Sequence, residues 1–152
     1  MSNEIKVCVD RVLPSDMQRE AESKAIAENP LNMPAPGAPA PLSGAVDARK
    51  LWAPGRVLRA CFLDGNESVQ EKVAAIAQEW TDYANIQLDF CDDSDAELRI
   101  SFQQPGSWSY IGTDALMIKP PNPTINFGWL TPDTDDEEYA RVVLHEFGHA
   151  LG

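Results

Sequence analysis

Residues 142–152 read VVLHEFGHALG, an apolar segment that is typical of a buried helix. His145 and His149 are four residues apart, so a helix places both on one face, about 40° apart at roughly 3.6 residues per turn. Two imidazoles in this arrangement can bind one Zn²⁺ ion. Glu146 between them can take a proton from water and later pass it to a leaving amine. The H-E-x-x-H pattern therefore predicts a zinc site with Glu146 as the general base.

A five-residue pattern also occurs by chance, and a histidine in an apolar helix is often only a core residue. Three observations favour the metal site. These are the only two histidines of the chain, and both fall inside a strongly helical segment. Gly152 extends the match to H-E-x-x-H-x-x-G.

The extended pattern calls for a third ligand three residues after Gly152, where the given sequence has already ended. Catalytic zinc sites usually have three protein ligands and a water. We therefore expect a fragment of a longer protein or a truncated form, with the third metal ligand supplied from beyond residue 152. We expect the isolated chain to be inactive or nearly so.

The composition narrows the range of binding partners that the chain can have. The chain has 152 residues and a net charge of −12, from 12 Lys and Arg against 24 Asp and Glu. Such acidity disfavours nucleic acid and anionic membranes. No apolar run reaches the roughly 18 residues of a membrane span. The N-terminus lacks a basic region followed by an apolar stretch, so no signal peptide is visible.

The cysteines do not have the pattern of a disulfide framework or of a zinc ribbon. Cys8, Cys61 and Cys91 form an odd set without C-x-x-C spacing. Cys61 and Cys91 can pair if their strands are neighbours, although isolated thiols fit the sequence better. Cys8 as a thiolate that blocks zinc is chemically feasible, but no neighbouring residue favours this over a structural thiol.

Composition also divides the chain into three parts. Residues 1–28 form an N-terminal segment, 29–50 a linker rich in Pro and Ala, and 51–152 a globular domain. The N-terminal segment is interpreted either as a pro-segment that covers the site until it is removed or as a simple extension.

Hydrophobic patterns predict the elements of the fold. A strand over 5–9 precedes a helix that a capping box at Ser15 opens and that ends near residue 28. Residues 57–63, 86–90 and 98–102 alternate as strands, and a long helix over 67–84 makes the first pair a parallel βαβ unit. Short strands follow at 108–111, 115–118 and 124–127, with prolines that suit a sheet edge.

The last helix starts at a second capping box, Thr134 to Glu137. Its Leu144, Phe147 and Leu151 form a flank that can pack on the sheet while both histidines face a cleft. Gly148 predicts a close approach by another backbone, and Gly152 a left-handed helix end.

Two motifs carry a family resemblance. From about Arg56 to Gly152 the chain resembles the N-terminal half of the catalytic domain of a metzincin zinc protease, closest to astacin-like and related microbial members. The motifs are HEFGHALG at 145–152 and WSYIG at 108–112, which is similar to an edge-strand segment of astacins. A departure is Ser107, where astacins usually have cysteine, so their disulfide pattern is absent.

The resemblance implies an α+β fold: the metzincin upper subdomain, with a twisted mixed sheet of about five strands, a backing helix and an active-site helix, without the lower subdomain. It implies zinc ligation by His145 and His149, with Glu146 as the base. It also implies that Trp108, Ser109 and Tyr110 line the substrate cleft, and that the protein is extracellular.

The predicted function is thus that of a zinc metalloendopeptidase acting on polypeptides by metal-activated water. The alternative is a truncated, inactive metzincin-like domain that binds peptides along its edge strand or binds metal weakly. No other histidine is available for a Ser-His-Asp or Cys-His arrangement, and no phosphate-binding loop is present.

Overall fold

The computed structural model of the protein describes residues 6–37 and 50–152. In this part of the chain six strands form one sheet in the order β1-β5-β6-β4-β2-β3. The strands are β1 (Cys8–Arg11), β2 (Arg56–Phe62), β3 (Ile86–Phe90), β4 (Leu98–Ser101), β5 (Ser107–Tyr110) and β6 (Ile125–Phe127). The helices are α1 (Gln18–Glu28), α2 (Glu67–Ala77) and α3 (Asp136–Leu151). Short 3-10 helices are η1 (Ser15–Met17), η2 (Pro30–Asn32), η4 (Gln78–Asp82) and η5 (Gly112–Met117).

The sheet is mixed but mostly parallel. β2 pairs in parallel with β3 and with β4, β4 with β6, and β1 with β5, whereas β5 and β6 are antiparallel. The βαβ prediction is therefore confirmed, because α2 connects the parallel strands β2 and β3. The sheet has one strand more than the prediction of about five, and the two terminal strands in its order are β1 and β3.

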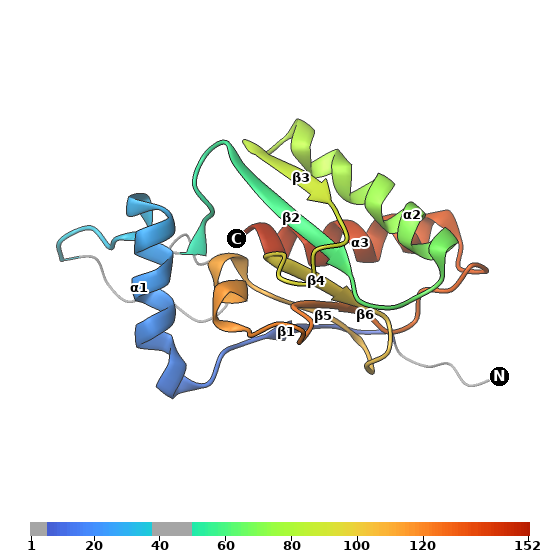
Figure 1. The fold of residues 1–152 in the computed structure, drawn as a ribbon, viewed down its shortest axis with the longest axis horizontal. Coiled ribbons are helices and arrows are strands. Elements are labelled where there is room, and N and C mark those ends of the chain that lie inside the picture. The colour runs from blue at the N-terminus through green and yellow to red at the C-terminus, as the bar shows by residue number, and fades with distance from the viewer. Residues whose placement is uncertain (1–5, 38–49) are drawn as a thin grey trace.

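Helices α2 and α3 pack on the same face of the sheet and form the main core with it (Figure 1). Strands β2 and β4 send alternate residues to this face, as their predicted alternation requires. The fully buried members of the core include Leu58, Leu98, Ile100, Val73, Val142, Val143 and Phe147. Truncation of a buried Phe such as Phe147 to Ala typically costs about 3–5 kcal/mol, so this packing holds α3 firmly in place.

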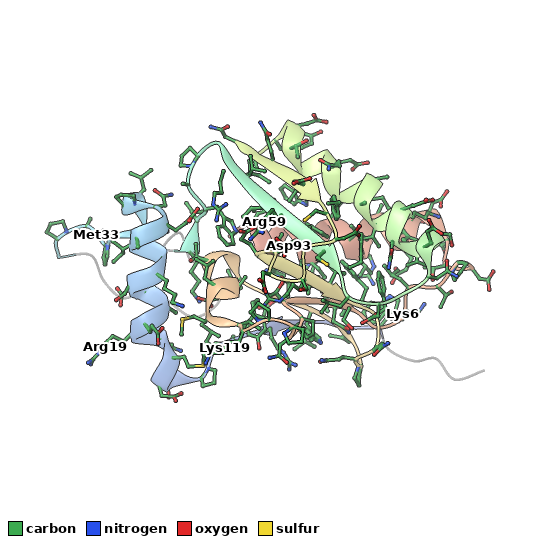
Figure 2. The ribbon with its side chains drawn as sticks, in the orientation of Figure 1. Lys6, Arg19, Met33, Arg59, Asp93 and Lys119 are labelled. Carbon is green, nitrogen blue, oxygen red and sulfur yellow. The ribbon has the colours of Figure 1, made fainter. Side chains whose placement is uncertain are left out.

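Two arginines connect β2 with the loop before β4 and with the N-terminal helix. Arg59 on β2 pairs with Glu97 at 3.0 Å and with Asp93, which lies beside it in Figure 2. Arg56 at the start of β2 binds Glu28 at the end of α1 at 2.9 Å. Each such partly exposed pair is worth at most about 1 kcal/mol. Of these pairs, Arg56–Glu28 is the one that helps to fix where α1 lies.

A second, smaller core joins the N-terminal region to η5. Leu13 and Ala21 are buried against Met117, and Met17 and Tyr110 pack around them. Helix α1 is thus anchored to the globular part although most of its residues are polar. Residues 38–49, most of the predicted linker, lie outside the described residues.

Several local predictions are wrong. Residues 112–117 form the 3-10 helix η5, where a strand over 115–118 was expected, because a run of four apolar residues suits a buried helical turn as well as a strand. Neither predicted capping box forms. Ser15 starts η1 without a side-chain cap, and α3 is capped by Asp135, which accepts a hydrogen bond from the Glu138 N–H.

The long helix predicted over 67–84 is also shorter than expected. Asn66 caps it through its side-chain oxygen, which accepts from the Ser68 N–H, but the α-helix ends at Ala77 and continues as η4. This change of pitch brings Trp80 onto α3. In contrast, Gly152 has φ +107° and ends α3 in the left-handed region, as predicted.

Candidate metal centre

The fold buries one side of α3 and leaves the other accessible. Val142, Val143 and Phe147 are completely buried, whereas His145 is exposed and His149 is about a quarter exposed. The indole of Trp80 lies against Gly148 and donates a hydrogen bond to the Leu144 carbonyl at 3.0 Å. The close neighbour of Gly148 is therefore a tryptophan ring and not the backbone that we predicted.

The two imidazoles converge on one point. Their Nε2 atoms lie 3.1 Å apart, and the rings are nearly perpendicular at 85°, with centroids separated by 4.6 Å. Two nitrogens bound to a tetrahedral Zn²⁺ at about 2.0–2.1 Å are roughly 3.3 Å apart. The structure thus brings the two predicted ligands to the separation that one metal ion requires.

Electrostatics favour the form of histidine that binds metal. The pKa of His145 is lowered, first by burial and then by the neighbouring His149, while the Asp10 carboxylate opposes the shift. A lowered pKa keeps the imidazole neutral at physiological pH, and only a neutral imidazole nitrogen can bind a cation.

Glu146 is the most unusual residue of the site. Its side chain is completely buried, and neither carboxylate oxygen has a hydrogen-bond partner in the described part of the chain. Burial raises its pKa to about 7, and Asp10 adds to the shift, whereas the nearby Cys8 thiol lowers it. A buried carboxylate without a protein partner is rare. Together with the paired imidazoles, it forms a donor set that fits a divalent cation and a water molecule.

Cys8 completes this cluster from the opposite end of the sequence. Its Sγ and the ligand atoms of His145 and Glu146 all lie within 4.8 Å of one another. The pKa of the thiol is raised to about 11, mainly by burial and further by Glu146. Thiolate, imidazole and carboxylate are all zinc ligands, so Cys8 can act as a ligand, which the sequence alone did not favour.

The parallel pairing of β1 with β5 explains why Cys8 reaches the site. Val9 is in register with Trp108 and Asp10 with Ser109, so β1 runs along the strand that the sequence had placed at the edge. Asp10 lies 3.1 Å from His149 through Oδ1 and Nε2. Asp10 was missed because no local pattern relates it to the histidines.

Of the three predicted cleft residues, Ser109 is buried, whereas Trp108 and Tyr110 line a cavity. Ser109 is fully buried, and its hydroxyl donates to the Tyr110 carbonyl at 2.7 Å. Trp108 is covered by Arg11, whose guanidinium lies 4.2 Å from the centroid of the indole. Trp108 and Tyr110 line a cavity of about 420 Å³ with Arg11, Met17, Gln104, Met117, Ile118, Lys119, Asn122 and Pro123. Their role in binding substrate stays a prediction.

The described helices include none that is long and apolar enough to cross a membrane.

The three cysteines are free thiols in the structure, although Cys91 follows β3 beside β2, which contains Cys61. Of the alternatives that the sequence left open, free thiols are the arrangement observed.

Two solved structures share the fold of this chain. A crystal structure of myroilysin aligns with a TM-score of 0.72 and 35% sequence identity, over 99% of this chain and 52% of that chain. A second structure of myroilysin aligns with a TM-score of 0.65 and 43% identity, over 68% of this chain and 50% of that chain. The present chain thus spans about half the length of the solved chains that it matches. No protein-family profile and no curated protein sequence matches it.

These similarities define the class of the fold. The predicted α+β class with a metzincin-like sheet and helices is confirmed, and the chain has the fold of myroilysin over nearly its whole length. Myroilysin is a metalloprotease, so this chain is similar to a metalloprotease in both sequence and structure.

Proposed function

We propose that this chain is part of a zinc-dependent metalloendopeptidase and carries two of its metal ligands and its general base. The observation that carries the proposal is the 3.1 Å separation of the His145 and His149 Nε2 atoms, beside a buried carboxylate that lacks a hydrogen-bond partner among the described residues. The similarity to myroilysin supports the same class.

The roles of the residues follow from their positions. His145 and His149 would hold the cation, through the two Nε2 atoms that lie 3.1 Å apart. Zinc supplies Lewis acidity, which lowers the pKa of water and polarises a peptide carbonyl. Glu146 takes a proton from the attacking water and delivers it to the leaving amine. Its pKa of about 7 suits both transfers, because a group that titrates near the working pH is effective as a base and as an acid.

We further propose that β1 keeps this site closed as part of a pro-segment. Its Cys8 Sγ lies within 4.8 Å of the ligand atoms of His145 and Glu146, so the thiol would compete with a substrate for a cation held there. The backbone of β1 pairs with β5. An extended polypeptide can add to the same strand by main-chain hydrogen bonds. Binding of a polypeptide substrate along β5 therefore requires β1 to leave.

The proposal is tested by zinc binding and peptide hydrolysis in matched variants. We expect one zinc per chain, lost in His145→Ala and in His149→Ala and retained in Glu146→Gln. Any hydrolysis of casein by this chain or by a longer form of the protein should disappear in Glu146→Gln. Hydrolysis that survives this substitution would exclude Glu146 as the base. Zinc binding without hydrolysis in every form would favour a non-catalytic, metal-binding domain.

A further inference from the structure

A short segment before β2 lies between the N-terminal helix and the end of α3 (Figure 1). We call residues Lys50–Ala53 the strap. Trp52 of the strap is only 4% exposed, and its indole N–H donates a hydrogen bond to the carbonyl of Ala150 at 2.8 Å. The last four carbonyls of a helix have no partner within the helix. Trp52 therefore caps one of them at a position from which water is excluded, since Ala150 is 1% exposed.

The backbone of the strap also lies close to Gly152 at the end of α3. The Lys50 carbonyl lies between two glycines. A Cβ added at Gly112 would collide with it, and a Cβ added at Gly152 would lie 3.0 Å from it and 3.2 Å from Leu51 Cδ2. Both glycines have positive φ, at +49° and +107°. The helix end is thus enclosed on the side of the strap, with little room to shift.

Helix α1 and η2 hold the strap from the other side through two buried asparagines. The side-chain amide of Asn32 donates to the carbonyls of Leu51 and Ala25, both at 2.8 Å, and its oxygen accepts the N–H of Leu51 at 2.9 Å. The Asn29 amide donates to the Trp52 carbonyl at 3.3 Å. Asn32 is 1% and Asn29 3% exposed. Three of the five side-chain hydrogen bonds of these asparagines end on the strap.

Charged groups fasten the two ends of the strap. Lys50 binds the buried carboxylate of Asp114 at 2.7 Å. At the other end the Ala53 N–H donates to Glu28, which also binds Arg56. The strap therefore joins α1, η5, β2 and the end of α3. Within the described part of the chain, Trp52 is the side chain of the strap that donates a hydrogen bond to α3.

We propose that Trp52 is a positioning residue of the metal centre. The strap holds the last turn of α3, and with it His149, at a fixed position relative to His145, and α1 stabilises the strap through Asn29 and Asn32. As far as it concerns zinc, this inference rests on the proposed function. The N-terminal region then contacts the centre twice: β1 meets the histidines directly, and α1 supports their helix through the strap.

The first experiment needs no metal. Trp52→Phe keeps an aromatic ring but removes the donor to Ala150. Trp129→Phe is the matched control, because its indole N–H also bonds to α3, to Glu138 at the other end of the helix. Hydrogen exchange of the backbone amides of residues 149–151 should be about tenfold faster in Trp52→Phe and within about twofold of the parent in Trp129→Phe. Equal exchange in parent and Trp52→Phe would overturn the proposal.

The second experiment measures zinc affinity by competition with a chromophoric chelator. Trp52→Phe and Asn32→Ala should each raise the dissociation constant, by about tenfold for Trp52→Phe, as for other residues that orient metal ligands. In the double variant the dissociation constant should rise by less than the product of the two single increases, because both substitutions act through the strap. Unchanged affinity in Trp52→Phe would contradict the positioning role. A parent that binds no zinc would refute the proposed function, and the exchange experiment would still decide the role of the strap.

Discussion

The candidate metal centre combines a helix and a strand, and different features of the sequence determine where each of them lies. Helix α3 supplies His145, Glu146 and His149 from one helical turn, so their arrangement follows from the geometry of the helix. Strand β1 brings Cys8 and Asp10 from the other end of the chain, through pairing with β5. A metal site encoded in one helix can therefore be predicted from sequence, whereas the segment that covers it depends on the tertiary fold.

The two regions also differ in how firmly they are held. The core side of α3 is completely buried between the sheet and α2. In β1, by contrast, Val9, Asp10 and Arg11 are exposed, and the buried anchor is Leu13, two residues after the strand. Segments with few buried contacts open at lower free energies than the core. We therefore expect β1 to separate from the site while α3 stays folded.

The largest effect is expected from the loss of an α3 ligand. His149→Ala should abolish zinc binding at stoichiometric concentrations, since a single remaining imidazole and a thiol bind too weakly. Isothermal titration with zinc measures this directly. Glu146→Gln is the control and should bind zinc with nearly the parent affinity. Tight binding by His149→Ala would show that β1, and not α3, supplies the main ligands.

Leu13→Ala should destabilise β1 without destabilising the core of α3. Truncation of a buried leucine costs about 2–4 kcal/mol, and Leu13 is 4% exposed beside Ala21 and Met117. Hydrogen exchange of the β1 amides should accelerate strongly, while the amides of α3 before its last turn keep their protection. Equal acceleration in both would mean that β1 and α3 unfold together.

Between pH 4 and pH 8 the stability should change through Glu146 of α3. The pKa of Glu146 is raised from 4.5 to about 7, so the folded protein binds the proton more tightly than the unfolded chain. The stability from this group is complete below pH 4.5 and is lost as the pH rises through about 7. Glu146→Gln should therefore stabilise the metal-free protein by roughly 2 kcal/mol at pH 8 and by little at pH 4. Thermal unfolding at both pH values measures the difference, and an equal effect at both would contradict the raised pKa.

The smallest effect is expected at Asp10. Its carboxylate is 60% exposed and lies 3.1 Å from His149. Exposed pairs contribute about 0.2–1 kcal/mol, so Asp10→Asn should lower the free energy of unfolding by less than about 0.5 kcal/mol. Urea unfolding of this variant and of Leu13→Ala gives the loss in the free energy of unfolding for each, and so shows whether the Asp10–His149 pair or the packing of Leu13 contributes more. A larger loss in Asp10→Asn would show that charge, and not apolar packing, holds the region.

Features that depend on neighbours in sequence were predictable. The i, i+4 spacing placed His145 and His149 on one face, Asn66 caps α2, and the alternation in β2 and β3 with a helix between them implied parallel pairing. Each of these follows from the chain geometry of a few residues.

Features that depend on distant partners were not predictable. Nothing near Cys8 distinguishes a ligand from a structural thiol until β1 is placed on β5. Gly148 indicated a close neighbour but could not identify it as the ring of Trp80. Trp52 has no local motif, and its role depends on the carbonyl of Ala150 at the far end of the sequence.

NMR of the histidine rings shows whether His145 and His149 bind one zinc ion together. The chain has only two histidines, so its spectrum reports on this site alone. One equivalent of zinc should shift the Nε2 resonances of both rings together, with no further change at higher ratios. Resonances that stay in place, or a shift of only one ring, would contradict the shared metal centre.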